Sequence, residues 1–259
     1  MAVTNTPELI EADRLSYYAI SKIEAQFIYK EIFTDHCYDI ANLPSNPFIV
    51  DAGANIGLFS LYMKRKYPQA KILAFEPAPV CYDVLSRNLA LNDALSGVKA
   101  LQCGLSSSAG TLPLTYFPNL PGNSTLVPEE KNKLYEEAVR KRGKETADER
   151  FGGAVKVDVE LKRLSDVLRE YYPDGKPDQG LERIDLLKVD VEGAELEVLK
   201  GVDEEHWELV RNVVVETWEP SGIRPQIEAL LEDKGFDITR DRAEWAPDQF
   251  SMITARRQD

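Results

Sequence analysis

The chain has 259 residues, of which 43% are hydrophobic and 29% charged, so it is long enough to bury one sizeable core. Its formal net charge of −13 argues against nucleic acid as a partner, because phosphate binding needs many Lys and Arg contacts. No apolar run approaches the ~20 residues of a membrane helix, and Met1 to Glu11 contains no apolar signal-peptide region, so we expect a cytoplasmic protein without a membrane partner.

The cysteines and histidines give little support for a metal site. Cys37, Cys81 and Cys103 form no CxxC pair, and the chain has only two histidines, so we predict no metal. A sparse, odd number of cysteines fits a reducing compartment. The residues give no indication of the oligomeric state.

The first 46 residues are predicted to be a helical segment that precedes the core. Apolar residues recur at helical spacing through Glu24 to Glu31, namely Ile23, Phe27, Ile28, Ile32 and Phe33. Pro44 and Pro47 then break the chain. We therefore divide the protein into an N-terminal helical cap segment, residues 1–46, and a core domain, residues 47–259.

Strands and helices alternate with short connections at the start of the core domain. The predicted elements are a strand at Phe48–Val50, a helix from Gly57, a strand at Lys71–Phe75, a helix at Val80 to Leu91 and a strand at Val98–Gln102. This alternation is typical of a parallel sheet with helices on its faces.

Regularity breaks between Thr111 and Ala154. Three prolines and a Gly-Asn turn predict an irregular loop, and Pro128 to Arg150 is a highly charged helical stretch without a clean apolar stripe. We interpret about residues 113–154 as an insertion. A lid over the sheet and a plain solvated excursion both fit this composition.

Regular structure resumes after the insertion and continues to the end of the chain. The predicted elements are Val155–Glu160, Leu164–Tyr171, Ile184–Val189, Glu195–Leu199, Val213–Val215, Pro225–Lys234, Phe236–Thr239 and Phe250–Ala255. Two final strands without an intervening helix predict an antiparallel pair, a feature of the methyltransferase variant of the doubly wound sheet. We therefore expect an α/β, Rossmann-like fold with a mostly parallel seven-stranded sheet and helices on both faces.

The first strand runs into a glycine-containing turn, the usual ligand position in such sheets. Compared with the dinucleotide fingerprint G-x-G-x-x-G, Asn55 replaces the second glycine and Leu58 the third. The Asp51 carboxylate would repel a pyrophosphate but favour a sulfonium or amino group, by about 4 kcal/mol at ~4 Å and an effective dielectric of ~20. The turn thus favours S-adenosylmethionine over NAD, unless Asp51 is a structural residue that caps the turn. The candidate cofactor contacts here are Asp51, Gly53, Ala54, Asn55 and Gly57.

Two further strand ends are predicted to contact the nucleoside. Glu76 lies 23 positions after Gly53, where an acidic residue accepts hydrogen bonds from the ribose hydroxyls of either cofactor. Pro77 would fix its turn. Gly104 and Leu105 follow the third strand and either flank the adenine or form an ordinary turn.

Three segments together resemble the FkbM-type methyltransferase family. They are VDAGANIG at Val50–Gly57, Phe75-Glu76-Pro77, and LKVDVEGAELEVLKG at Leu187–Gly201. The resemblance covers roughly Tyr29 to Glu216. It implies methyl transfer from S-adenosylmethionine, mostly to oxygen, on sugars or on secondary metabolites such as polyketides and peptides. It also implies cofactor contacts at Asp51, Gly53, Asn55, Gly57 and Glu76, with Asp190 and Glu192 at the reacting centre.

Four residues are candidate catalytic groups. Asp190 and Glu192 follow a buried strand that should lie beside the first, so they would reach the methionine half of the cofactor. Glu216 ends the next strand, and neighbouring carboxylates raise each other's pKa until one is a usable base. Glu192 could instead cap a helix. His36 is matched to neutral pH as a base, unless it is an ordinary surface residue.

Other residues are open to two interpretations. Gly122 to Thr125 either touches the acceptor or forms a plain turn. Four aromatic residues either line an acceptor pocket or belong to the core and surface: Tyr116, Phe117, Trp218 and Trp245. Glu195 and Glu197 are expected to be solvated helix residues.

The leading prediction is an O-methyltransferase that acts on a small or carrier-bound metabolite. Methylation of nitrogen or carbon stays an alternative, because the residues predicted to bind the cofactor do not indicate which acceptor atom is methylated. An NAD-dependent oxidoreductase is disfavoured by the missing second glycine and the lack of a Tyr-x-x-x-Lys constellation. A non-catalytic cofactor-binding domain is disfavoured by the pair Asp190 and Glu192.

Overall fold

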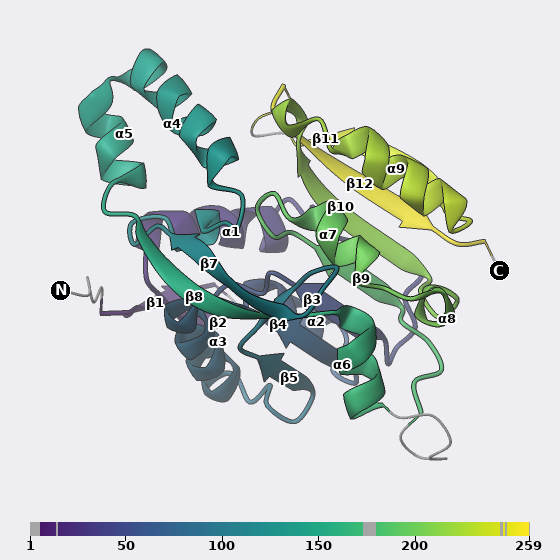
Figure 1. Cartoon of the computed structure of the whole chain (residues 1–259). Coiled ribbons are helices and arrows are strands. Elements are labelled where there is room, and N and C mark those ends of the chain that lie inside the picture. The colour runs from purple at the N-terminus through teal and green to yellow at the C-terminus, as the bar shows by residue number, and fades with distance from the viewer. Residues whose placement is uncertain (1–5, 14, 173–179, 244–245, 247, 259) are drawn as a thin grey trace.

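The strand β3 (Phe48–Ala52) is buried along its whole length in the computed structural model, which describes residues 6–13, 15–172, 180–243, 246 and 248–258. β3 lies within a seven-stranded sheet of order β11-β12-β10-β9-β3-β4-β5 (Figure 1). It pairs in parallel with β4 (Lys71–Phe75) and β9 (Leu186–Val189). Successive side chains of a strand point to opposite faces, so β3 contributes to two separate cores.

Helices cover both faces of this sheet, as predicted. One core cluster includes residues of α1 (Lys22–Phe33), α2 (Leu58–Lys66) and α3 (Pro79–Leu91). The other includes residues of α6 (Leu164–Tyr171), α7 (Glu195–Lys200), α8 (Glu204–Trp207) and α9 (Arg224–Asp233). The sheet therefore lies between two helical layers.

The C-terminal strands confirm the predicted antiparallel ending. β12 (Phe250–Arg256) inserts between β10 (Asn212–Trp218) and β11 (Asp237–Arg242) and runs antiparallel to both. The opposite edge is β5 (Val98–Leu101), which pairs in parallel with β4. A short 3-10 turn, η2 (Glu219–Ser221), follows β10.

The expectation that the whole segment before the core is helical is wrong for its first part. β1 (Glu8–Ala12) and β2 (Leu15–Ala19) form an antiparallel pair ahead of α1. Alternate residues of β2 are buried, and the Asn88 amide of α3 bonds both the N–H and the C=O of Tyr18, at 2.6 and 2.9 Å. The hairpin is thus stabilised by packing on α3 rather than by local propensity.

The region predicted to be an irregular loop begins with a strand, β7 (Gly110–Tyr116), that belongs to a second, small sheet. β6 (Gly104–Leu105), β7 and β8 (Val155–Lys162) form a three-stranded sheet of order β6-β8-β7. Pro113 pairs with Asp158 within the β7–β8 ladder. β7 is an edge strand, so the missing N–H of this proline leaves no ladder bond unmade.

Two charged helices extend from this small sheet as an arm. The predicted helical stretch is split at Gly143 into α4 (Pro128–Arg142) and α5 (Lys144–Phe151), and the 3-10 turn η1 (Pro121–Asn123) precedes them. In Figure 1 the arm projects from the body near the C-terminal ends of the parallel strands. Over the described ranges, no helix combines the length and apolar character that crossing a bilayer requires.

Gly53 of the turn after β3 is required by contact with protein rather than by approach to a ligand. Its φ is +80°, and a Cβ atom added there would lie 1.8 Å from the carbonyl oxygen of Asp190. Gly57, with φ +89°, would meet Leu85 of α3 at 2.5 Å. The turn thus fixes the spacing between β3, the loop after β9 and α3.

We expect Gly53→Ala to destabilise the protein by about 3 kcal/mol or more, because the new Cβ forces both a backbone clash and a left-handed alanine. Denaturant unfolding followed by circular dichroism measures this. Gly110→Ala is the control, since a Cβ there meets no atom within 4 Å, and should stay within about 0.5 kcal/mol. Equal effects of the two substitutions would refute this role of Gly53.

Candidate active site

A cavity of about 1010 Å³ lies at the C-terminal ends of the central parallel strands. It is lined by the turn after β3, by residues after β4 and β9, and by β10. Open α/β sheets bind ligands at this edge. The remaining walls come from α1, the η1 loop and the α4–α5 arm. The volume is at the upper end of the range for ligand sites, which suits a nucleoside cofactor together with an acceptor.

Most of the predicted cofactor contacts line this cavity. They are Gly53, Ala54, Asn55, Glu76, Pro77, Gly104, Leu105 and Asp190. Asp51 and Gly57 are not among the described residues that line it. The structure thus brings four distant segments together around one space and places two of the predicted contacts behind its wall.

Asp51 is a buried structural residue, so the electrostatic argument built on it needs correction. Its side chain is fully buried, accepts a hydrogen bond from Ser60 at 2.8 Å and lies 3.2 Å from the ammonium of Lys188. The positive charge of Lys188 thus already balances the negative charge of Asp51 in the absence of a ligand. The carboxyl groups that can face a ligand are instead those that line the cavity.

Glu76 is held rigidly at the cavity wall. One oxygen accepts a hydrogen bond from the N–H of Asn55 and the other from the N–H of Ala78, each at 2.8 Å. Burial raises the pKa of Glu76 to about 7, although both backbone bonds oppose the shift. The orientation of this carboxyl group is therefore fixed before a ligand arrives.

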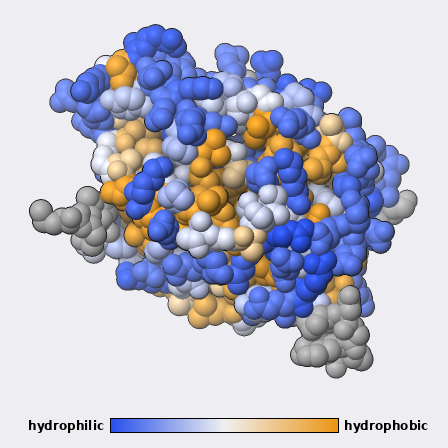
Figure 2. Space-filling model, in the orientation of Figure 1, coloured by the Kyte–Doolittle hydropathy of each residue, from blue (hydrophilic) through white to orange (hydrophobic). Residues whose placement is uncertain are grey.

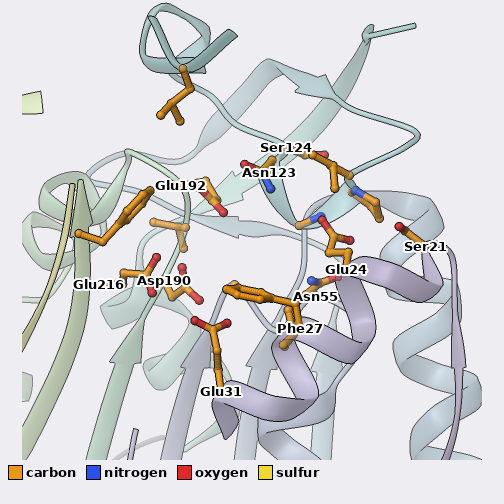
Figure 3. A pocket seen from close by; sticks show the side chains of 18 of the residues that line it. Ser21, Glu24, Phe27, Glu31, Asn55, Asn123, Ser124, Asp190, Glu192 and Glu216 are labelled. Atoms are coloured by element: carbon orange, nitrogen blue, oxygen red, sulfur yellow. The ribbon is translucent and has the colours of Figure 1, made fainter. Parts of the chain in front are cut away.

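Four carboxyl groups meet at the inner end of the cavity. Figure 3 shows Asp190, Glu192 and Glu216 around one space, with Glu31 pointing toward them from α1. Asp190 accepts a hydrogen bond from the Tyr38 hydroxyl at 2.9 Å and lies 3.6 Å from Lys188. Its negative charge is thus compensated within the protein.

Glu192 anchors the arm and does not cap α7. It has a φ of +59°, pairs with the buried ammonium of Lys131 in α4, and its carbonyl accepts a hydrogen bond from Thr125 at 2.6 Å. Burial raises its pKa, and Lys131 opposes this shift. The alternative interpretation as a helix cap is wrong, because the N-cap residue of α7 is Ala194, no side chain caps this helix, and the Glu192 carboxylate pairs with Lys131 instead.

Glu31 and Glu216 differ from their two neighbours in having no partner. Within the described part of the chain, neither carboxyl group forms a hydrogen bond or an ion pair. Burial, and next the charge of Asp190, raises the pKa of Glu31 to about 8 and that of Glu216 well above its ordinary value. Both groups therefore keep a proton to a higher pH than an exposed carboxyl group does.

The structure does not bring His36 to this centre. Its imidazole Nδ1 lies 2.9 Å from the Tyr62 hydroxyl and 3.8 Å from Asp39, and its side chain is about half exposed. His36 is not among the described residues that line the cavity. Its position at the surface agrees with the simpler of the two interpretations made from the sequence.

The acidic residues of α1 were missed by sequence reasoning. Glu24, Phe27 and Glu31 lie on one face of α1 and line the cavity. The pKa of Glu24 is raised to about 8 by burial, and its carboxyl group accepts a hydrogen bond from Gly122 at 3.0 Å. The available signal was two acids spaced seven residues apart within an apolar helical stripe.

The loop and aromatic candidates have mixed outcomes. Gly122, Asn123 and Ser124 line the cavity, whereas the buried aromatics Tyr116 and Phe117 do not. Trp218 lines a small neighbouring cavity, and Trp245 lies outside the described residues. Glu195, expected in solvent, is only 3% exposed, and burial raises its pKa to about 7.

The protein has a Rossmann-like class I methyltransferase fold. This fold is defined by the strand order of the sheet, by the antiparallel strand β12 and by the cavity at the strand ends. A solved structure of an FkbM methyltransferase from Methylobacillus flagellatus KT shares this fold, with a TM-score of 0.52 and 14% identity over 83% of this chain and 45% of that chain.

The sequence profile described as the Methyltransferase FkbM domain matches residues 51–238, and the protein belongs to this family of S-adenosylmethionine-dependent methyltransferases. The chain is 47% identical over 247 residues to Methyltransferase 1 of Beauveria bassiana (strain ARSEF 2860), covering 93% of both proteins. It is 34% identical over 244 residues to 31-O-demethyl-FK506 methyltransferase FkbM of Streptomyces tacrolimicus, covering 90% of both.

We expect Lys188→Met to lower the free energy of unfolding by about 3–5 kcal/mol, because it leaves the Asp51 carboxylate buried without its ion-pair partner. Urea denaturation measures the loss, and the double variant Asp51→Asn/Lys188→Met should recover part of it. Lys200→Met serves as control, since Lys200 is an exposed residue whose ion pair is worth at most about 1 kcal/mol. A loss below 1 kcal/mol for Lys188→Met would contradict this account.

We expect Glu31→Gln to raise the melting temperature at pH 8 by about 2–4 °C. Between pH 4.5 and 8 the unfolded chain releases this proton while the folded protein keeps it, so stability falls as pH rises through this window. Glutamine removes that loss, and the two proteins should melt alike near pH 4.5. Melting curves at both pH values, with the exposed Glu11→Gln as control, test the sign; a lower melting temperature at pH 8 would reverse it.

Proposed function

We propose that this methyltransferase transfers the methyl group of S-adenosylmethionine to a hydroxyl oxygen of a small or carrier-bound secondary metabolite. The observation that carries the proposal is the pair of unpartnered carboxyl groups, Glu31 and Glu216, beside the compensated Asp190. An alcohol becomes a good nucleophile only as its proton is removed, and a carboxylate of raised pKa is suited to that task.

The lining of the cavity supports S-adenosylmethionine as the cofactor. Asn55 lines it, and the buried Oδ1 of this residue has no hydrogen-bond partner within the described chain, so it can accept from a ligand. Glu76 would hold the ribose hydroxyls, and Gly104 with Leu105 the adenine. Asp190 and the turn at residues 53–55 would hold the methionine end. When bound, this cofactor supplies an electrophilic methyl group on a positive sulfur and leaves as a neutral thioether.

Other residues of the chain would position the carboxyl groups and accept the proton of the acceptor. Tyr38 and Lys188 hold Asp190 in place, and Lys131 holds Glu192. The acceptor oxygen gains the methyl group as its proton goes to the Glu216 carboxylate, with Glu31 opposite. Loss of the sulfonium charge and gain of this proton leave the total charge of the site unchanged, so the reaction creates no uncompensated charge in a buried place.

The apolar residues that line the cavity support an acceptor with an apolar frame. They include Phe27, Leu120, Phe250 and, from the arm itself, Phe151. Figure 2 shows apolar surface in the hollow between the hydrophilic arm and the C-terminal strands. The name of the Streptomyces relative states methylation at an oxygen of FK506, which supports the choice of oxygen. Three free cysteines support a cytoplasmic location.

Calorimetry tests the cofactor part of this proposal. We expect S-adenosylmethionine to bind and NAD not to bind, and Glu76→Ala to weaken binding at least about tenfold, because it removes a charge-assisted hydrogen-bond acceptor worth about 1.5–3 kcal/mol. Glu11→Ala, at an exposed site, should bind as the parent does. Binding of NAD alone would end the proposal.

Methyl transfer from labelled cofactor to a panel of hydroxylated polyketides, peptides and sugars tests the acceptor part. The methyl carbon shift in NMR spectra of the product distinguishes O-methyl from N-methyl and C-methyl groups. Glu216→Gln should lower kcat at least about a hundredfold if a carboxylate takes the proton. A product methylated on nitrogen or carbon would overturn the choice of oxygen.

A further inference from the structure

A second, small cavity of about 10 Å³ adjoins the active site on the side of β10. It is lined by Glu195, Glu216 and Trp218, among others. This volume is about that needed by a single water molecule. Glu216 lines both this space and the main cavity, so its carboxyl group lies between the two.

Two buried polar atoms at this small cavity have no hydrogen-bond partner within the described chain. They are the indole N–H of Trp218, whose side chain is 8% exposed, and Oε2 of Glu195, which is 3% exposed. Leaving a buried donor and a buried acceptor unpaired costs about 1–3 kcal/mol each. A water molecule satisfies both at once, since it accepts one hydrogen bond and donates two.

The second oxygen of Glu195 has a structural role that does not involve this space. Oε1 accepts a hydrogen bond from the N–H of Gly193 at 2.8 Å and so fixes the loop between β9 and α7. A glutamine or a glutamate serves equally well for that bond. Holding the loop therefore does not explain why the second oxygen is buried at the small cavity.

We propose that this cavity binds one water molecule that joins Trp218, Glu195 and Glu216, and that the proton of the acceptor passes through it from Glu216 to Glu195. The water site stands on the unpaired atoms alone, whereas the proton path rests on the proposed function. Glu195 is then a positioning and proton-storing residue that does not touch the substrate.

The proton transfer balances in two linked steps. The Glu216 carboxylate takes the proton of the acceptor hydroxyl as the O–CH₃ bond forms. Glu216 then gives a proton to the water, while the water gives one of its own to Oε2 of Glu195. The water is unchanged, Glu216 is again a carboxylate, and Glu195 is neutral until it returns the proton to solvent through the same path after the product has left.

Burial and the neighbouring charges make both groups keep a proton to a higher pH than an exposed glutamate does. Burial raises the pKa of Glu195 to about 7 and raises that of Glu216 as well. The charged or titratable groups that face them come from α1 and the segment after it, from α4 and from the end of β9. They include Glu31, Cys37, Tyr38, Glu130, Lys131, Lys188, Asp190 and Glu192. Carboxyl groups outnumber ammonium groups there, which favours retention of a proton.

A crystal structure at high resolution tests the water site without any reaction. We expect an ordered water within hydrogen-bond distance of Trp218 Nε1, Glu195 and Glu216. We expect its loss in Trp218→Phe, which keeps an aromatic side chain and removes the N–H donor. A dry cavity in the parent protein, or an undisturbed water in Trp218→Phe, would refute the site.

Glu195→Gln tests the proton path, because glutamine keeps the bond to Gly193 and cannot take the proton. We expect kcat to fall about tenfold, an altered pH profile of kcat, and affinity for S-adenosylmethionine within twofold of the parent by calorimetry. Glu197→Gln, on the same helix but outside both cavities, should leave kcat unchanged. Unchanged kcat in Glu195→Gln would refute the path while leaving the proposed function intact, whereas a parent enzyme that methylates no hydroxyl would refute the proposed function and leave the water site intact.

Discussion

The buried ammonium of Lys188 is the interaction on which the rest of the site depends. It lies 3.2 Å from Asp51 and 3.6 Å from Asp190 and donates a hydrogen bond to the carbonyl of Gly53 at 2.7 Å. The rings of Tyr38 and Phe59 lie within 6 Å of it. One charge thus joins the strand β3, the glycine turn and the loop after β9. Its desolvation is offset by two carboxylates and a carbonyl, an arrangement that tolerates no missing partner.

The acidic residues of the cavity differ in whether a cation balances their charge. Asp190 is compensated by Lys188 and Tyr38, and Glu192 by Lys131, so both are fixed features of the wall. Glu31 and Glu216 receive no such compensation, and their raised pKa follows from burial beside Asp190. Acids of similar sequence context therefore differ in pKa according to the cations that reach them.

The sheet was predictable because alternating strands and helices constrain each other, and the turn, Glu76 and Asp190 follow from position at strand ends. The prediction that Asp51 faces the cofactor was wrong, because the sequence alone does not show that Lys188 on the neighbouring strand pairs with it. Glu24 and Glu31 were hidden within an apolar helix, because only packing reveals which face of α1 meets the cavity. The strand β7 was predicted as a loop because it contains Pro113. A proline is tolerated in an edge strand, and the sequence alone does not show which strand lies at the edge of a sheet.

The arm encloses the cavity without belonging to either core. Only Lys131 in α4 and Ala147 in α5 are buried, and the described polar links to the body include Lys131 to Glu192 and Gln249 to Glu137. One of these links, the Lys131–Glu192 ion pair, is shielded from water. The arm therefore forms one wall of the cavity without taking part in the packing that holds the central sheet together.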